Sequence, residues 1–304
     1  MNYRKLGKTN IEVSEIGFGA LGIGGVFYGH KDRAESLRAI ERALDLGINI
    51  FDTCPGYGNS EEILGEAFDG RRDQIVISTK ISTRGFDTIA ASVEHSLGRL
   101  RTDYLDVLQL RDPTPEKVSN LNVIEDMARL KEQGKIRCGS VTVGDSRLTQ
   151  QALYAIEAGF DSIQMAYNMI FRDAAEAALP ESGKADVGVL IRGPLCKGFL
   201  TSRIQSIPEE TRAKGSFSQF TIDEAETLIR IQKELQFLAV PGRSLAQAAI
   251  QFAIRPESVS TVIPSMDQVA EVEELVGAIT APQLTDGEIE AATQVIRNNT
   301  AIEY

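Results

Sequence analysis

The stretch that decides the fold reads Ile48-Asn49-Ile50-Phe51-Asp52-Thr53-Cys54-Pro55-Gly56-Tyr57-Gly58. Its apolar start, Ile48 to Phe51, has the length of a short buried strand, and the strand ends at the carboxylate of Asp52. The Pro55-Gly56 turn then brings the phenol of Tyr57 back toward that end. Taken singly, Asp52 could cap the next helix and Tyr57 could be a half-buried loop aromatic. Together they predict a strand that delivers two titratable groups to one end of a sheet.

Short apolar runs of the same kind recur along the chain and alternate with helical patterns. The candidate strands lie near residues 16–18, 48–51, 75–78, 104–110, 136–141, 162–165, 187–191 and 259–263. The helical patterns cover residues 32–47, 89–100, 123–133, 148–158, 223–235, 245–254 and 269–279. The first of them starts with Asp32 and Glu35 in a capping-box spacing and ends at Gly47. The alternation predicts a parallel sheet with right-handed crossovers, and strands and helices in this number close an α/β barrel of the (β/α)8 TIM type.

Three segments lie outside this alternation. Residues 3–6 and 11–13 flank Gly7-Lys8-Thr9-Asn10 and predict an N-terminal β-hairpin. Residues 284–298 look like a C-terminal helical tail, which would either plug the far end of the barrel or pack outside it. Residues 201–221 are polar and aperiodic, which is typical of a lid or binding loop, although a plain insertion looks the same. No linker-like composition divides the chain, so we expect residues 1–304 to form one domain.

Composition and charge limit the classes of partner. The net charge of -11 disfavours nucleic acid, and no apolar run approaches the length of a membrane span, so we expect a cytoplasmic protein with a small-molecule partner. The three cysteines are odd in number and widely spaced, which favours reduced thiols over disulfides. They offer no metal-ligand spacing, and we expect no metal.

Charged and polar side chains follow the carboxyl ends of several predicted strands. They are Asp52, Lys80, Arg111, Gln164 and Arg192. Any one of them could be a solvated flank or half of an ion pair. In α/β barrels, however, the chemistry lies at this end of the strands, and consecutive strands are neighbours around the rim. The pattern therefore predicts a functional site at the barrel mouth, with Tyr57 reaching over it.

Short motifs spread over nearly the whole chain resemble one known family. They are Gly17-Phe18-Gly19-Ala20, residues 45–53 with Tyr57-Gly58 and Ser60-Glu61, Thr79-Lys80, residues 96–100, 103–106 and 134–137, Gln164 with Tyr167-Asn168, Pro194-Leu195 with Gly198, and Ile263-Pro264. In these motifs the sequence is similar to the aldo-keto reductases. The resemblance implies a (β/α)8 barrel in which a nicotinamide cofactor reduces a carbonyl by hydride transfer.

The resemblance also implies catalytic roles. Tyr57 would be the general acid, Lys80 and Asp52 would tune it, and Arg111 falls at the fourth place of the family's catalytic tetrad, where most members have His. A phenol with a pKa near 10 protonates an alkoxide well, and the adjacent ammonium is expected to lower that pKa toward working pH. Arginine exchanges no proton at neutral pH but suits a carboxylate or phosphate. His30, in the loop after the first predicted barrel strand, is the alternative source of an imidazole.

For the cofactor, the resemblance implies contacts along the same rim. They come from Gly19, Ala20, Asp52, Thr142, Gln164, Arg192, Pro194, Leu195, Gly198, Arg203, Ser265 and Glu271. The Ser-Asn pair that usually holds the carboxamide appears here as Thr142-Val143. The stretch with Ser265, Asp267 and Glu271 is acidic where NADP-preferring relatives carry Lys or Arg, which favours NAD(H) over NADP(H). Arg203 is the counter-argument, because it could reach a 2′-phosphate.

The predicted function is that of an NAD(P)-dependent oxidoreductase that interconverts a carbonyl and an alcohol on a small polar substrate. Because of Arg111, we expect this substrate to carry a carboxylate or phosphate. Arg111 also leaves two alternatives open: a redox-neutral enzyme, such as a dehydratase, or a cofactor-binding regulatory subunit built on the same barrel. The sequence indicates no oligomeric state.

Overall fold

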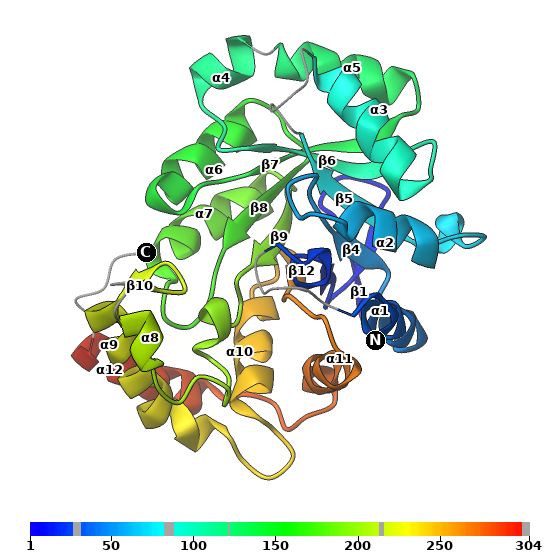
Figure 1. Ribbon diagram of the computed structural model, residues 1–304. Coiled ribbons are helices and arrows are strands. Elements are labelled where there is room, and N and C mark those ends of the chain that lie inside the picture. The colour runs from blue at the N-terminus through cyan, green and yellow to red at the C-terminus, as the bar shows by residue number, and fades with distance from the viewer. Residues whose placement is uncertain (27–31, 82–87, 121, 213–215, 300–304) are drawn as a thin grey trace.

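The computed structural model describes residues 1–26, 32–81, 88–120, 122–212 and 216–299 of the 304-residue chain. Within these residues eight parallel strands form one sheet in the order β12-β9-β8-β7-β6-β5-β4-β3, with helices around it (Figure 1). The strands are β3 (Phe18–Gly19), β4 (Ile50–Asp52), β5 (Val76–Lys80), β6 (Leu105–Arg111), β7 (Ile136–Thr142), β8 (Ser162–Ala166), β9 (Gly188–Arg192) and β12 (Val259–Ile263). Parallel bridges from Ile16 to Val262 and from Gly19 to Ser265 join the two edges. The predicted (β/α)8 barrel is confirmed.

Side chains along each strand point alternately into the barrel and toward the helices. The floor of the barrel is apolar and is closed by the predicted hairpin of β1 (Tyr3–Lys5) and β2 (Glu12–Ser14). The cluster there consists of Leu6, Ile11, Val13, Ile50, Val76, Val107, Cys138, Leu190 and Ile263. Two residues further along β4, β5 and β6 stand Asp52, Ser78 and Gln109, all buried and polar. The polar groups are therefore lifted toward the carboxyl ends of the strands.

Most helices fall where the periodicity predicts them. They are α1 (Arg33–Asp45), α3 (Ile89–Leu100), α5 (Val123–Glu132), α6 (Leu148–Glu157), α9 (Ile222–Glu234), α10 (Leu245–Ile254) and α11 (Val269–Val276). Asp32 caps α1 by accepting from the N–H of Ala34, but the Glu35 side chain does not complete the predicted capping box with the N–H of Asp32. Glu35 accepts from Arg38 and from the N–H of Val269, so it ties α1 to α11.

The sequence pattern missed four helices: α2 (Ser60–Ala67), α4 (Pro115–Asn120), α7 (Asp173–Lys184) and α8 (Glu209–Arg212). The reason is clearest in α7, which contains Pro180 and buries mainly small residues such as Ala175, Ala178 and Ser182. Small side chains give a weak apolar periodicity even when their face is fully packed.

The C-terminal tail forms α12 (Asp286–Asn299), which packs against α9 and the short helix η5 (Leu235–Leu238) (Figure 1). Of the two placements considered, packing outside the barrel is therefore correct. The segment after β9 is more regular than predicted, since it contains α8 and the strands β10 (Ser216–Phe217) and β11 (Phe220–Thr221). Phe220 is buried there against Phe199.

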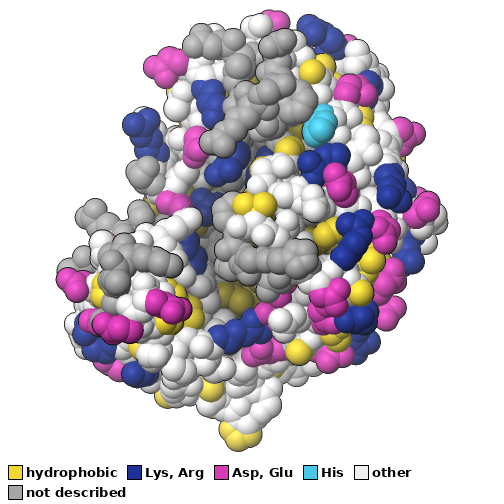
Figure 2. Space-filling model, viewed as in Figure 1, with side chains coloured by type: hydrophobic (Ala, Val, Ile, Leu, Met, Phe, Trp, Pro, Cys, Tyr) yellow, Lys and Arg dark blue, Asp and Glu magenta, His cyan; other side chains and the backbone are white. Residues whose placement is uncertain are grey.

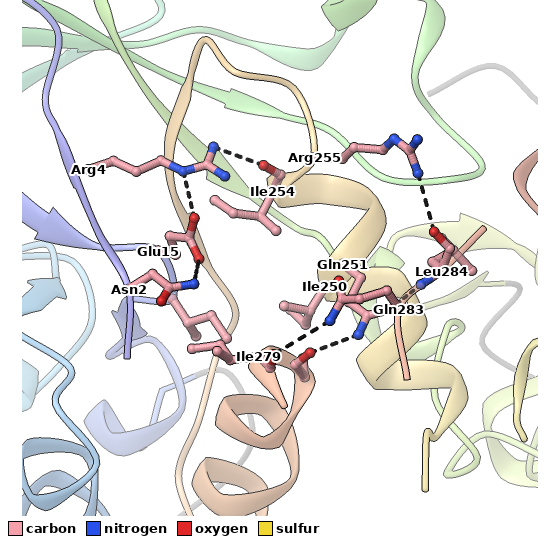
Figure 3. Close-up of a pocket in the computed structure, with 12 residues that line it drawn as sticks. Asn2, Arg4, Glu15, Ile250, Gln251, Ile254, Arg255, Ile279, Gln283 and Leu284 are labelled. Carbon is pink, nitrogen blue, oxygen red and sulfur yellow. Dashed lines mark hydrogen bonds and ion pairs between the residues drawn. The ribbon is translucent and has the colours of Figure 1, made fainter. Parts of the chain in front are cut away.

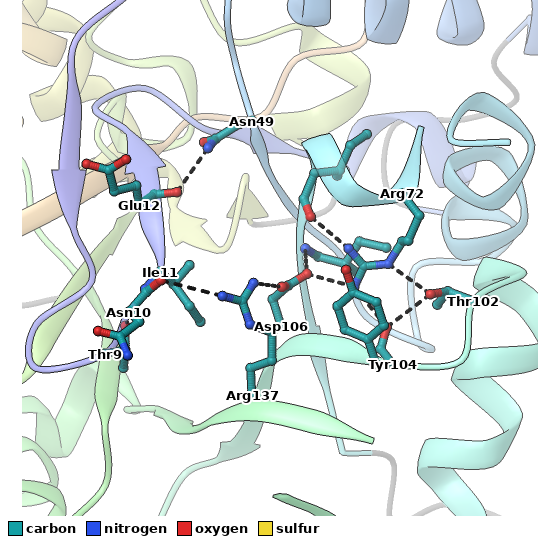
Figure 4. Close-up of polar contacts among 12 residues, drawn as sticks. Thr9, Asn10, Ile11, Glu12, Asn49, Arg72, Thr102, Tyr104, Asp106 and Arg137 are labelled. Atoms are coloured by element: carbon teal, nitrogen blue, oxygen red, sulfur yellow. Dashed lines mark hydrogen bonds and ion pairs between the residues drawn. The ribbon is translucent and has the colours of Figure 1, made fainter. Parts of the chain in front are cut away.

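A charged cluster braces the amino-terminal end of the barrel (Figure 4). Asp106 is fully buried near the start of β6 and accepts from Arg72, Arg137 and the N–H of Ile77. The guanidinium of Arg72 also lies 3.7 Å from the centroid of the Tyr104 ring. Charge at this end of a barrel is structural, because the rim is at the other end of the strands.

A cavity of about 320 Å³ lies at the same end, between the hairpin, α10 and the chain leading to α12 (Figure 3). Arg4 and Arg255 flank it. Arg4 donates to Glu15 and to the carbonyl of Ile254, and Arg255 donates to the carbonyl of Leu284. Protein groups thus already satisfy both of these cations.

Within the described ranges, no helix is long and apolar enough to cross a membrane.

Candidate functional site

The predicted rim residues do lie at the carboxyl ends of neighbouring strands. Asp52 ends β4, Lys80 ends β5, Arg111 ends β6, Thr142 ends β7 and Arg192 ends β9. The register of the strands places these residues at similar heights along the barrel axis. Lys80 pairs with Gln109, Arg111 with Thr142, and Thr142 with Gln164 in β8. One edge of the barrel therefore presents acid, base and amide groups in sequence.

Lys80 and Asp52 form a buried ion pair at the centre of this rim. Lys80 is 2% exposed, and its Nζ donates to Asp52 Oδ2 at 2.7 Å and to the carbonyl of Thr53 at 2.9 Å. Asp52 Oδ1 accepts from Ser78 Oγ at 2.9 Å and from Gln109 Nε2 at 2.8 Å. Burial by itself lowers the pKa of Lys80, but Asp52 and Tyr57 outweigh it and raise that pKa above its ordinary value. Lys80 is therefore held as an ammonium.

Tyr57 stands beside this ammonium on a loop that is fixed from two sides. Lys80 Nζ lies 5.4 Å from the centroid of the Tyr57 ring. A Cβ on Gly24 would come within 1.5 Å of the Tyr57 carbonyl oxygen, so only glycine lets the loop after β3 pack there. On the other side, Arg99 donates to the carbonyl of Gly58.

The pKa of Tyr57 corrects one expectation. The ammonium of Lys80 does act to lower the pKa of the phenol, as does Arg111, but burial raises it by more. The net pKa lies above the ordinary value of 10, so the prediction that Lys80 brings it toward working pH is wrong for this state of the site. Tyr57 is consequently held as a neutral phenol.

Glu61 supports β5 and the Tyr57 loop from behind. It is fully buried, and its Oε1 accepts from Thr79 Oγ1 at 2.8 Å, next to Lys80 in β5. Its Oε2 lies 3.4 Å from Nε of Arg99, which in turn holds Gly58. Burial raises the pKa of Glu61. The sequence marked Ser60-Glu61 and Arg99 as motif residues, and the structure shows that they brace the Tyr57 loop.

Arg111 is the exposed cation of the rim. No described residue forms a side-chain hydrogen bond or ion pair with it, and its carbonyl accepts from Lys117. Burial lowers the pKa of Lys117; Asp112 opposes this shift and Arg111 adds to it. Figure 2 shows Lys and Arg side chains around a hollow in the face toward the viewer. The alternative pairing of Arg111 with Asp52 or Asp112 is not found, and His30 lies outside the described residues.

The far side of the rim presents an unpaired amide. Gln164 is 1% exposed, its Nε2 is buried without a hydrogen-bond partner, and its Oε1 lies 3.4 Å from Thr142 Oγ1. Buried side-chain donors are nearly always paired in folded proteins, so one left unpaired at a barrel mouth suits an acceptor brought by a ligand. A carboxamide oxygen is such an acceptor, and the residues present therefore fit a nicotinamide.

The other residues expected at the cofactor lie at the ends of strands or in the segments that follow them. They are Gly19 at the end of β3 and Ala20 after it, Arg192 at the end of β9 with Pro194, Leu195 and Gly198 after it, Arg203, Ser265 after β12, and Glu271 in the first turn of α11. Arg192 is already engaged, since it donates to Asp145 and to the carbonyl of Val143. Arg203 forms an ion pair with Glu271, whose other oxygen accepts from the N–H of Asp267 at 2.8 Å.

Sequence reasoning missed Ser78 and Gln109, which both contact Asp52. A signal was available, because each lies two positions before a rim residue, Lys80 or Arg111, on the same strand. A period of two places both side chains inside the barrel. Their partners could not be read from that period.

Residues 15–297 match the model of the Aldo/keto reductase family. The chain belongs to the aldo-keto reductase family. It is 29% identical over 306 residues to the oxidoreductase YqkF of Bacillus subtilis (strain 168), and this alignment covers 96% of this chain and 95% of the relative. It is also 29% identical over 318 residues to L-galactose dehydrogenase of Arabidopsis thaliana, with 98% and 96% covered.

A solved structure agrees with this membership. The holo form of the aldo-keto reductase AKR11C1 from Bacillus halodurans superimposes with a TM-score of 0.80 at 27% identity, covering 100% of this chain and 98% of the other. This aldo-keto reductase is accordingly an NAD(P)-dependent oxidoreductase.

Proposed function

We propose that this aldo-keto reductase interconverts a carbonyl and an alcohol on a small polar substrate that carries a carboxylate or phosphate. The observation that supports it best is the juxtaposition at one rim of a neutral phenol, a buried ammonium and an exposed guanidinium. Tyr57 and the Lys80–Asp52 pair supply acid chemistry. Arg111 supplies a cation that no described side chain neutralises.

In the proposed mechanism each residue has a separate task. When bound, the nicotinamide cofactor supplies hydride transfer. Tyr57 donates its hydroxyl proton to the carbonyl oxygen, and Lys80 stabilises the phenolate that remains. Gln164 and Thr142 would hold the carboxamide of the bound cofactor, while Asp52 keeps the Lys80 ammonium charged and in place.

The anionic substrate class follows from the charge balance. Asp52 is already committed to Lys80, Ser78 and Gln109, so it is not available to Arg111. A guanidinium at a barrel mouth is stabilised by a counter-charge, and its planar fork suits a carboxylate or phosphate. A ligand with such a group would complete the site.

A panel of carbonyl compounds tests the proposal. Reduction would be followed with NADH and with NADPH on 2-oxo acids, phosphorylated aldehydes and uncharged sugars of the kind named for the Arabidopsis relative. We expect turnover with preference for the anionic members. Mass spectrometry of ligand released on denaturation is the companion measurement. A released dinucleotide without turnover of any carbonyl would instead favour the redox-neutral or regulatory alternative.

NAD(H) is the cofactor we propose over NADP(H), and the test is a fluorescence titration. Glu271 and Asp267 follow β12 where a 2′-phosphate would need cations, and Arg203 is already paired with Glu271. We expect NADH to bind about 10-fold more tightly than NADPH, as one unfavourable charge contact of about 1.4 kcal/mol would give.

Glu271→Gln is the matched variant for this titration. It removes the carboxylate closest to Arg203 and leaves that guanidinium only the 4.0 Å pair with Glu274 among the described residues, so NADPH binding should improve while NADH binding changes little. Tighter binding of NADPH than of NADH by the wild-type enzyme would overturn the assignment.

A further inference from the structure

Gln109 lies between the two halves of the rim and contacts both. It is fully buried in β6. Its Nε2 donates to Asp52 Oδ1 at 2.8 Å and contacts Ser78 Oγ, while its Oε1 accepts from Thr142 Oγ1. Thr142 Oγ1 in turn lies 3.4 Å from Gln164 Oε1. A continuous line of side chains therefore crosses the barrel from Lys80 to Gln164.

The partners of Gln109 fix which way its amide faces. If the amide were turned over, its oxygen would meet the carboxylate of Asp52, and two acceptors in contact repel each other. The nitrogen therefore faces Asp52 and the oxygen faces Thr142. No other orientation satisfies both neighbours.

This orientation also fixes what Thr142 can offer a ligand. A threonine hydroxyl has one proton, and here Gln109 accepts it, so the remaining lone pairs of Thr142 are acceptors. Gln164 has the opposite character, because its Nε2 is an unpaired buried donor. An acceptor beside a donor matches the N–H and C=O groups of a carboxamide.

We infer that Gln109 is a positioning residue that couples the acid side of the rim to its carboxamide side. Its amide N–H orients the carboxylate that holds Lys80, and its carbonyl sets Thr142 as an acceptor for the nicotinamide amide. This inference rests on the proposed placement of the nicotinamide at Thr142 and Gln164. It assigns Gln109 no contact with the substrate or the reacting atoms.

Gln109→Met tests the carboxamide side through binding alone. Dissociation constants for NADH and for ADP-ribose, which lacks the nicotinamide, would be measured by calorimetry on the full-length enzyme. We expect NADH to bind about 5- to 10-fold more weakly, as the loss of one oriented hydrogen bond gives, with ADP-ribose within about 2-fold of wild type. Ser78→Ala leaves the bond from Thr142 to Gln109 intact and should preserve the ratio of the two constants.

Gln109→Glu separates the two ends and carries the test if the Met variant does not fold. The new carboxylate still accepts from Thr142, so the NADH to ADP-ribose ratio should stay within about 2-fold of wild type. On the other side it meets Asp52 instead of donating to it, and two carboxylates in contact share a proton. The shared proton raises the pKa of one of the two carboxyl groups. The acid limb of the pH profile of kcat/KM should therefore move to higher pH by about one unit.

Three outcomes decide the matter. An unchanged NADH to ADP-ribose ratio in Gln109→Met, or an unchanged pH profile in Gln109→Glu, overturns the coupling role and makes Gln109 a packed polar residue. A lower preference for NADH in Gln109→Met, together with a preserved ratio and a shifted pH profile in Gln109→Glu, supports the coupling role. If the wild-type enzyme itself binds NADH no better than ADP-ribose, the proposed nicotinamide placement is wrong, and the role of Gln109 falls with it.

Discussion

Replacing Tyr57 by Phe is expected to lower kcat for carbonyl reduction by about 10²- to 10⁴-fold, which is the contribution of one positioned general acid. The change removes a single oxygen atom from a ring that keeps its packing beside Lys80. The loop should hold its place, because Gly24 and Arg99 contact its backbone and not the phenol. NADH affinity and thermal stability should therefore stay close to wild type, and steady-state kinetics with a binding titration measure both.

The pH profile of the wild-type enzyme gives an independent check on the same residue. The profile of kcat/KM reports groups of the free enzyme, and burial raises the pKa of Tyr57 above its ordinary value of 10. An acid must be protonated to donate, so reduction should be lost only as pH rises through that raised pKa. We therefore expect kcat/KM for reduction to stay constant from about pH 6 to pH 9 and to fall only at higher pH. A fall centred near neutral pH would contradict this.

Tyr154→Phe is the matched control, because Tyr154 lies on α6 and packs against the core, away from the rim. It should change kcat little. If Tyr57→Phe kept its activity, the proton would come from another group, and His30 would be the first to substitute.

The fold was predictable because one periodic signal repeats along the whole chain. Each strand of the barrel is a short apolar run with a polar end, and Ile50 to Asp52 shows the pattern at its shortest. The signal fails where burial uses small side chains, as in α7. It also could not place the tail, since the apolar face of α12 fits a barrel end as well as the surface of α9.

The meeting of the candidate residues at one rim was predictable from the sequence, but their contacts were not. Parallel strands bring their carboxyl ends together, so Asp52, Lys80 and Arg111 could be assigned to one rim from order alone. The direction of the pKa shift of Tyr57 could not be predicted from the sequence, because it depends on how deeply the loop buries the phenol. The period of two could place Gln109 inside the barrel, but its contacts on both sides require the three-dimensional arrangement.

Replacing Arg111 by His is expected to change substrate preference. The comparison uses one carbonyl compound that bears a carboxylate and its methyl ester. In the wild-type enzyme the exposed guanidinium should favour the acid, since a hydrogen bond to a charged group contributes about 1.5–3 kcal/mol. Arg111→His should therefore lower the acid-to-ester ratio of kcat/KM by about 10- to 100-fold.

Arg111→Lys makes this test specific for the forked donor. Lysine keeps the positive charge but loses the planar two-point contact, so the ratio should fall between those of the wild type and the His variant. Lys117, whose ammonium donates to the Arg111 carbonyl, remains in all three proteins and so contributes a constant background of charge. If Arg111→His raised reduction of both compounds without changing their ratio, Arg111 would be a modified member of the tetrad that binds no anion. An acid-to-ester ratio that decreases from Arg to Lys to His at position 111 would instead place the substrate's charged group against Arg111, on the β6 side of Tyr57.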